Sequence, residues 1–191
     1  MNFKRRLLPL FLALGFVTLI YGVKLLISLA GIKLIINLTD SAPHGVYAVV
    51  PLNELKKGTF IVFPVPFSVR HELGVRPWLR DDVPLIKPVA ALPGEKVCVS
   101  EAEVIVAGQK GGPVFSRDYL GLPLPRLRGC FSIRAGSVFP FSTFSDRSFD
   151  GRYLGPIHRG DIIGEAVPII LWSGSLSGWK PTSNSSGEPS S

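Results

Sequence analysis

The chain of 191 residues is long enough for one domain of about 100–150 residues once a hydrophobic N-terminal segment and a polar tail are set aside. Its 20 Gly and 17 Pro residues, together with many Val, Ile and Phe residues in the middle, favour short strands joined by turns, so we expect a mainly β fold. The formal net charge is +7, and the basic residues are scattered along the chain and not clustered. This distribution argues against a nucleic-acid partner and fits attraction to an anionic membrane surface.

The N-terminal segment combines a basic start with a long apolar run. Residues 7–23 carry no charge and follow Lys4, Arg5 and Arg6. As a helix this run would rise about 26 Å, close to the hydrocarbon thickness of a bilayer. We therefore predict a transmembrane anchor at 7–23, with residues 1–6 in the cytoplasm and 24–172 outside it. A cleavable signal peptide is the alternative, because residues 28–30 (Ser-Leu-Ala) offer small side chains at a suitable spacing.

Short apolar runs separated by turn-forming residues predict the strands of the domain at 24–172. The predicted strands are 32–38, 45–50, 58–63, 84–89, 96–99, 103–107, 131–133 and 137–141, and residues 161–172 close the domain. The intervening segments are expected to be irregular: a loop or insertion at 64–83, a Gly-rich turn at 108–112 and an irregular stretch at 115–129. The Ser-, Gly-, Pro- and Asn-rich tail, 173–191, is expected to be disordered.

Cys98 and Cys130 are the two cysteines of the chain. No His or Cys cluster near them offers a four-ligand zinc set, so we expect neither a metal site nor a cofactor. One disulfide is compatible with a domain outside the cytoplasm, and two unpaired buried thiols are the alternative.

Three segments place a polar residue among apolar strands and next to turn-forming residues. In the first, 39–47 (TDSAPHGVY), Ser41 stands at a strand end, where a nucleophilic hydroxyl and the local backbone N–H groups can face a substrate carbonyl. In the second, 85–95 (LIKPVAALPGE), Lys87 stands in an apolar strand, where burial would lower the pKa of its amine and make it a usable base. By itself, each has an ordinary explanation: a turn serine, or an edge-strand lysine that keeps its charge in water.

The third segment, 145–156 (SDRSFDGRYLGP), is polar. Asp150 and Arg152 lie on the same side of any extended segment, so they can pair with each other or orient a neighbouring group.

Together and in this order, the three segments resemble the signal peptidase I superfamily (peptidase S26), whose members are serine proteases with a Ser–Lys dyad. SAPHGVY is similar to the nucleophile box, KPVAALPGE to the lysine box and SFDGRYLGPI to the last conserved box. The resemblance runs from the N-terminus to about Trp172 and has no firm counterpart for 64–83. It implies a signal-peptidase-like β domain of short antiparallel strands behind one transmembrane helix.

Details resemble the TraF-type signal peptidases of bacterial conjugation systems. Their lysine box contains VAALPG followed by Val-Cys, as 89–98 does here, and a Gly-Cys pair follows a Pro-rich stretch, as at Cys130. The resemblance thus implies a disulfide between Cys98 and Cys130. Pro88, Glu95 and Gly151 depart from the housekeeping leader peptidase pattern.

The resemblance also implies roles for the site residues. Ser41 would be the nucleophile, Lys87 in its neutral form the general base, and the Ser41 N–H an oxyanion donor, to which the Thr39 hydroxyl would add a second donor. Ser148 would orient the lysine amine.

The last box would supply an ion pair that shapes the site. Asp150 and Arg152 match that pair, and the essential Asp associated with TraF-type enzymes is assigned to Asp150 rather than Asp146. A Ser-His-Asp triad with His44, His71 or His158 is the rival mechanism, although none of these histidines lies in a matching motif.

The expected partners are the lipid bilayer and an exported precursor protein, for the conjugative branch a pilin, with no nucleic acid. The expected location is the inner membrane of a bacterium, with the catalytic domain on the periplasmic side. Alternatives from the same resemblance are a general leader peptidase of the secretion pathway and an inactive homologue that binds exported peptides along a sheet edge.

Overall fold

The computed structural model describes residues 3–29, 31, 33–74, 76–79 and 83–173. The chain divides into two units, residues 1–34 and residues 35–191. Apart from Ser173, the predicted disordered tail, 173–191, lies outside the described residues.

The first unit consists mainly of helix α1, Phe3–Leu29. The apolar run that the sequence predicts as an anchor, 7–23, lies within this helix. In the part of the chain that the structure describes, none of the helices is both long enough and apolar enough to cross a membrane.

The second unit is built around a seven-stranded sheet with the strand order β1-β2-β11-β3-β4-β9-β10. Its strands are β1 Lys33–Asn37, β2 His44–Val50, β3 Phe60–Phe63, β4 Leu85–Ala91, β9 Ser137–Pro140, β10 Ile157–His158 and β11 Gly164–Ser173. The registers from β2 to β10 are antiparallel. The mainly β prediction is therefore confirmed, and most predicted strands lie within a few residues of their observed positions.

Burial along the strands shows where the sheet is covered. In β2 buried and half-buried residues alternate, as expected of a strand with one face on the core. In β3 all four residues are buried, and in β4 six of seven are. Lys87 pairs with Ile61 of β3, so it stands in an interior strand and not at an edge.

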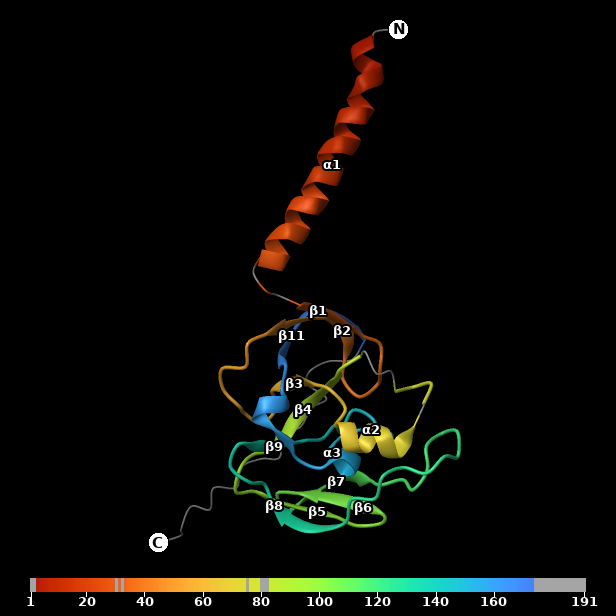
Figure 1. The fold of residues 1–191 in the computed structure, drawn as a ribbon, viewed down its shortest axis with the longest axis vertical. Helices are drawn as coiled ribbons and strands as arrows, with labels where there is room; N and C mark the ends of the chain where they lie inside the picture. Colours follow the sequence, from red (N-terminus) through yellow and green to blue (C-terminus); the bar gives the residue numbers. More distant parts are fainter. Residues whose placement is uncertain (1–2, 30, 32, 75, 80–82, 174–191) are drawn as a thin grey trace. The chain divides into compact units, whose positions relative to one another are not determined.

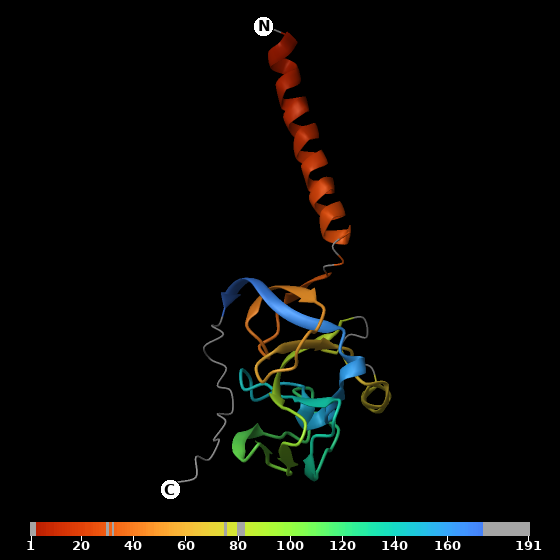
Figure 2. The ribbon, with the colours of Figure 1, turned by 90° about the vertical axis from the view of Figure 1, so that its left-hand side faces the viewer.

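A smaller sheet has the strand order β7-β6-β5-β8. Its strands are β5 Lys96–Val99, β6 Glu103–Val106, β7 Gln109–Pro113 and β8 Gly129–Ser132. In both ribbon views it lies at the end of the domain opposite β2 and β11 (Figures 1 and 2). Cys98 and Cys130 are direct partners in the register of β5 and β8, and their sulfur atoms form a disulfide, as the family resemblance predicts.

Two sequence predictions were wrong in detail. The segment 64–83, predicted as a loop or insertion, contains helix α2, Phe67–Leu73. Residues 108–112, predicted as a Gly-rich turn, form much of β7. A Cβ atom at Gly111 would lie 2.8 Å from the ring of Phe141, so this glycine lets a strand pack closely against an aromatic side chain.

The core of the domain consists of several clusters of buried apolar residues. One cluster joins β5 and β6 to Phe139 and Phe141. Another cluster joins residues of β2, β3 and β4, among them Tyr47, Phe60 and Ile86. The polar segment with Asp150 lies between β9 and β10 in sequence and contains the short helix α3, Gly151–Leu154, which is followed by a 3-10 turn at Arg159–Asp161.

The disulfide should stabilise the domain through the loop that it closes. The two cysteines are 32 residues apart, and closing such a loop contributes about 3–4 kcal/mol in the chain-entropy model. We expect the variant Cys98→Ser/Cys130→Ser to lose about that much unfolding free energy in urea titrations. Reductant should shift the wild-type midpoint toward that of the variant and leave the variant unchanged. A wild-type midpoint insensitive to reductant under unfolding conditions would contradict the prediction.

Candidate active site

Ser41 lies in a turn between β1 and β2, where backbone carbonyls are held by side-chain donors. The Ser41 carbonyl accepts from the Ser142 hydroxyl at 2.7 Å, and the Pro43 carbonyl accepts from the Tyr47 hydroxyl at 2.6 Å. Ser41 itself is 6 % exposed. Among the described residues, the Ser41 N–H has no hydrogen-bond acceptor. This turn therefore leaves an N–H group free beside a nearly buried hydroxyl.

Lys87 reaches the same point from the middle of β4. Its Nζ atom hydrogen-bonds the Ser41 Oγ, although the two residues are 46 positions apart in the chain. The lysine side chain is 3 % exposed. Burial lowers the pKa of Lys87 to about 8, the Asp150 carboxylate opposes this effect, and the Arg152 guanidinium adds to it.

Asp150 and Arg152 form the predicted ion pair, fully enclosed. Arg152 Nε donates to Asp150 Oδ1 at 2.9 Å, and Arg152 Nη2 donates to Asp150 Oδ2 at 3.1 Å. The remaining guanidinium hydrogens reach the carbonyls of Pro113, Asp146 and Ser142. The ring of Phe141 lies 4.3 Å from the guanidinium carbon. Every polar group of the pair is thus satisfied away from water.

Asp150 is also tied to the nucleophile turn through Ser142. Its Oδ2 atom accepts from the Ser142 N–H at 3.0 Å, while the Ser142 hydroxyl donates to the Ser41 carbonyl. Asp146, the rejected alternative, contributes its backbone carbonyl to Arg152. The geometry therefore connects Asp150, and not the Asp146 side chain, to Ser41.

Thr39 and Ser148 both lie near Ser41 and Lys87, but only Thr39 bonds to one of them. The Thr39 hydroxyl is 3.2 Å from the Ser41 hydroxyl and donates to Asn37 Oδ1 at 2.7 Å. Ser148 is 2 % exposed and lines the same cavity as Ser41 and Lys87. Its hydroxyl has no hydrogen-bond partner within the described part of the chain, so it makes no direct bond to the lysine amine here.

Two site residues were missed by sequence reasoning, Asn37 and Ser142. Asn37 is a polar residue at the end of the apolar run 32–38, and this was the signal available for it. Ser142 lies in a polar segment whose pattern does not distinguish one serine from another. Its bond to the Ser41 carbonyl joins residues 101 positions apart, which only the fold brings together.

The histidines are not arranged as a triad with Ser41. His44 Nε2 lies 3.0 Å from Asp40 Oδ1 and His158 Nδ1 accepts from the Gly160 N–H. His71 lies in α2. The basic side chain that hydrogen-bonds the Ser41 hydroxyl is Lys87.

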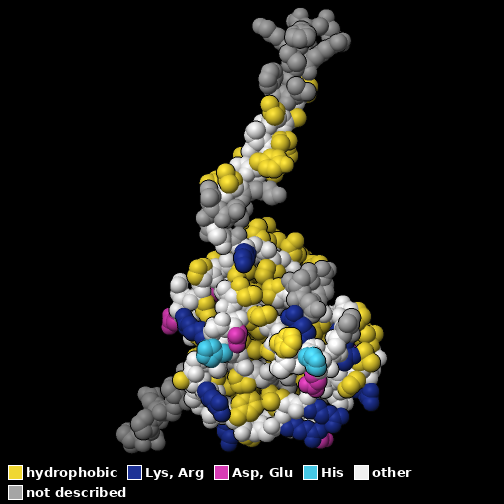
Figure 3. Space-filling model, viewed as in Figure 1, with side chains coloured by type: hydrophobic (Ala, Val, Ile, Leu, Met, Phe, Trp, Pro, Cys, Tyr) yellow, Lys and Arg dark blue, Asp and Glu magenta, His cyan; other side chains and the backbone are white. Residues whose placement is uncertain are grey.

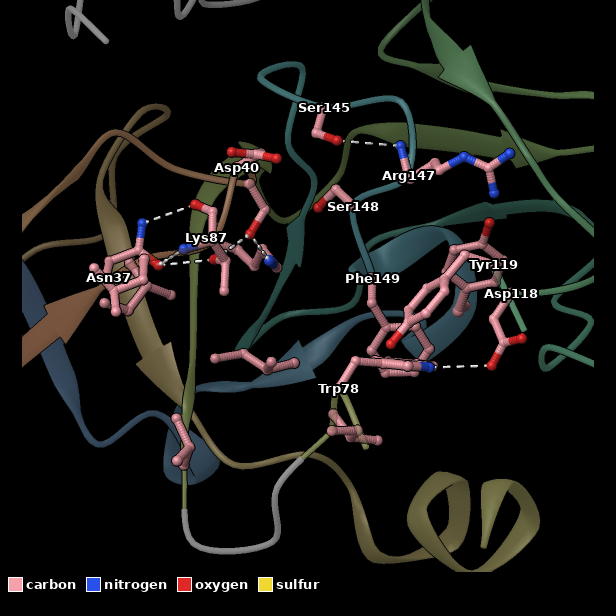
Figure 4. A pocket seen from close by; sticks show the side chains of 18 of the residues that line it. Asn37, Asp40, Trp78, Lys87, Asp118, Tyr119, Ser145, Arg147, Ser148 and Phe149 are labelled. Atoms are coloured by element: carbon pink, nitrogen blue, oxygen red, sulfur yellow. Dashed lines mark hydrogen bonds between the residues drawn. The ribbon is translucent and has the colours of Figure 1, made fainter. Parts of the chain in front are cut away.

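Ser41 and Lys87 open onto a cavity of about 550 Å³. Asn37 and Lys87 lie on one side of it, and Trp78, Asp118, Tyr119 and Phe149 lie on the other (Figure 4). Most of the other lining side chains are apolar, such as Leu79 and Leu124. A cavity of this volume lies within the range of ligand-binding pockets in proteins.

The comparisons with known proteins identify a family. The family model described as "Signal peptidase, peptidase S26" matches residues 5–172. The chain belongs to this family, which is a family of serine peptidases.

The curated relatives identify the branch. The chain is 32% identical over 156 residues to a plasmid transfer protein TraF of Escherichia coli, covering 75% of this chain and 85% of that protein. It is 32% identical over 151 residues to a probable conjugal transfer protein TraF of Sinorhizobium fredii, covering 72% and 77%. A signal peptidase I of Enterococcus faecalis V583 matches with a TM-score of 0.36 and 19% identity, covering 60% of this chain and 97% of that structure. The TraF-type resemblance inferred from the lysine box is thereby confirmed.

Removing the Asp150 carboxylate should destabilise the domain strongly. Asp150→Ala leaves the Arg152 guanidinium enclosed without its counter-charge, and we expect a loss of about 3–5 kcal/mol in unfolding free energy. The matched control is Glu54→Ala, which breaks the exposed pair of Glu54 with Lys56. Urea titrations followed by tryptophan fluorescence should show a large midpoint shift for Asp150→Ala and little change for Glu54→Ala. Equal shifts in the two variants would contradict the prediction.

Proposed function

We propose that this protein is a serine endopeptidase that cleaves exported precursor proteins with Ser41 as nucleophile and Lys87 as general base. The observation that carries the proposal is the hydrogen bond between Lys87 Nζ and Ser41 Oγ in an enclosed site. A buried amine beside a hydroxyl, with a lowered pKa, is the arrangement that proton abstraction from serine requires.

In the proposed reaction the neutral Lys87 amine accepts the Ser41 proton as the hydroxyl oxygen attacks the scissile carbonyl carbon. The tetrahedral intermediate carries its negative charge on the former carbonyl oxygen, where the Ser41 N–H can donate. The Lys87 ammonium then gives its proton to the leaving amine, the peptide bond breaks and an acyl-enzyme remains. A water molecule, deprotonated by Lys87, resolves the ester and frees Ser41.

The pKa of Lys87 sets the pH dependence of this reaction. With a pKa of about 8, roughly a tenth of the enzyme carries a neutral amine at pH 7. Because only that form accepts a proton, activity should rise with pH. It should level off once Lys87 is deprotonated.

The neighbouring residues have supporting roles in this proposal. Asp150 and Arg152 fix the segment that holds Ser142 against the Ser41 carbonyl. Thr39 lies 3.2 Å from the Ser41 hydroxyl, but its own hydroxyl hydrogen goes to Asn37 Oδ1, so in this arrangement it is an acceptor toward Ser41 and not a second oxyanion donor. Ser148 has an unpaired hydroxyl in the cavity and is available to the lysine amine when a substrate fills the site.

For the substrate we propose an exported protein of a conjugative transfer system, such as a pilin. The support is that relatives of this chain are plasmid transfer and conjugal transfer proteins TraF. The apolar cavity beside the dyad fits a cleavage site with small side chains.

Cleavage should depend on both members of the dyad. Ser41→Ala and Lys87→Ala should each lower kcat by about 10³-fold or more, while Lys110→Ala, which removes an exposed lysine on β7, should change it little. For the wild type, the logarithm of kcat/KM should rise with a slope near one below a pH of about 8 and then level off. The measurement is mass-spectrometric cleavage of a pilin precursor by detergent-solubilised protein.

Two outcomes of that measurement would reject the proposal. Activity that survives Lys87→Ala would exclude lysine as the base. Binding of the precursor without cleavage by the wild type would indicate a peptide-binding homologue. Cleavage of secretory precursors in general, with no preference for the pilin, would favour a general leader peptidase.

We further propose that α1 holds the enzyme in the inner membrane, with the β domain on the periplasmic side. Most described side chains between Leu12 and Leu26 are large, apolar and exposed. On the domain, Ile36, Leu38 and Trp172 are also exposed, and hydrophobic side chains gather over its upper part in Figure 3, where β1, β2 and β11 lie in Figure 1. The disulfide supports a location outside the reducing cytoplasm.

This location is testable with a reporter joined to the C-terminus of the full chain. Alkaline phosphatase, which folds only outside the cytoplasm, should be active in the fusion, and the fusion should sediment with membranes. A β-galactosidase fusion at the same point should be inactive. The reverse pattern would contradict the proposed topology, and a soluble fusion would contradict the anchor.

A further inference from the structure

Asn37, the last residue of β1, makes an unusually complete set of bonds to the turn that carries Ser41. It is 6 % exposed. Its Nδ2 atom lies 3.0 Å from the Thr39 carbonyl, 3.0 Å from the Ala42 carbonyl and 3.1 Å from the Pro43 carbonyl, and these three acceptors share its two hydrogens. Its Oδ1 atom accepts from the Thr39 N–H at 3.2 Å and from the Thr39 hydroxyl at 2.7 Å. Figure 4 shows the amide beside Lys87 on the same side of the cavity.

The orientation of this amide follows from its neighbours. Backbone carbonyls surround one of its terminal atoms, and a carbonyl can only accept, so that atom must be the nitrogen. The other terminal atom faces a backbone N–H, which can only donate, so that atom must be the oxygen. A flipped amide would oppose like groups at four contacts.

These bonds constrain the direction in which Ser41 points. Asn37 holds the carbonyls on both sides of Ser41 in the turn, and Ser142 holds the Ser41 carbonyl itself. These carbonyls point toward their donors. Among the described residues, the Ser41 N–H has no acceptor, and the Ser41 hydroxyl hydrogen-bonds Lys87 Nζ. Within the described part of the chain, the hydrogen bonds of the Asn37 side chain go to Thr39, Ala42 and Pro43, and not to the Lys87 amine or the Ser41 hydroxyl.

Asn37 also sets the direction of the Thr39 hydroxyl hydrogen. A hydroxyl has one hydrogen, and in this structure Thr39 gives it to Asn37. The Thr39 oxygen is then an acceptor toward Ser41, 3.2 Å away. The Ser41 hydroxyl thus contacts both the Thr39 hydroxyl, which Asn37 orients, and the lysine amine.

We propose that Asn37 is a positioning residue, which holds the 39–43 turn so that the Ser41 hydroxyl faces Lys87. This inference rests on the proposed Ser–Lys chemistry for its effect on rate, but its effect on the Ser41 position is independent of that chemistry. The experiment therefore has one arm that measures cleavage and one that does not.

In the cleavage arm, Asn37→Ala should lower kcat about 10- to 100-fold with KM changed less than about twofold, because the substrate cavity is kept while the hydroxyl is misaligned. Asn37→Asp keeps the acceptor for Thr39 but places an oxygen against three carbonyls, so it should not restore kcat. Ser100→Ala is the matched control, since it also removes side-chain bonds to backbone groups of a turn, in the β5–β6 hairpin. It should keep wild-type kcat. Assays are run well below the unfolding midpoint of every variant.

The second arm uses the Ser41→Cys variant. Both natural cysteines are in the disulfide, so iodoacetamide alkylates the introduced thiol. The nearby lysine amine, when protonated, favours the thiolate, so the pH dependence of alkylation reports how close the thiol lies to Lys87. Adding Asn37→Ala should move the apparent thiol pKa toward the ordinary value of about 8.5, and adding Ser100→Ala should not.

The two arms separate the two hypotheses. A thiol pKa that moves with Asn37→Ala supports the positioning role even if the wild type cleaves nothing, in which case the proposed peptidase function fails by itself. An unchanged thiol pKa in Asn37→Ala overturns the positioning role. Wild-type kcat in Asn37→Ala or in Asn37→Asp overturns it as well, while the dyad stands.

Discussion

The enclosed ion pair between Asp150 and Arg152 is the interaction on which the site depends. Burying two charges costs several kcal/mol for each ion unless their hydrogen-bonding groups are satisfied. Here the carboxylate and the guanidinium satisfy each other, and the spare guanidinium hydrogens bind carbonyls from three separate points of the chain. The guanidinium is therefore fully satisfied only when those three points are in place.

The same pair bears on the proposed role of Lys87 as a base, because its charges act on the pKa of the lysine amine. With Lys87 neutral, the charges of Asp150 and Arg152 balance. Protonation of Lys87 would leave one excess positive charge among buried groups, which burial and the Arg152 guanidinium both oppose. The Asp150 carboxylate limits the effect, so the lowered pKa of Lys87 stays near the physiological range. An amine with a pKa of about 8 is both deprotonated often enough to accept a proton and basic enough to hold it.

The sequence predicts well those parts of the site that depend on local pattern. Apolar runs and turn residues predict the strands that carry Lys87 and end before Ser41, because burial and turn geometry act over a few residues. Asn37 and Ser142 are not predicted, because their importance lies in bonds to backbone carbonyls, which every residue possesses and which leave no trace in residue type. Strand β7 was predicted as a turn for a related reason. Glycine usually signals a turn, but at Gly111 it is required by the close approach of Phe141 across the core.

The small sheet contributes a backbone group to the site. Pro113 ends β7, and its carbonyl accepts from Arg152 at 2.8 Å. Strand β7 is held by β6, β6 by β5, and the disulfide joins β5 to β8. A covalent bond outside the cavity thus stiffens the sheet that presents an acceptor to the guanidinium. Arg152 bonds to Asp150, Asp150 to Ser142, and Ser142 to the Ser41 carbonyl. A continuous series of hydrogen bonds therefore links the small sheet to the turn that carries Ser41.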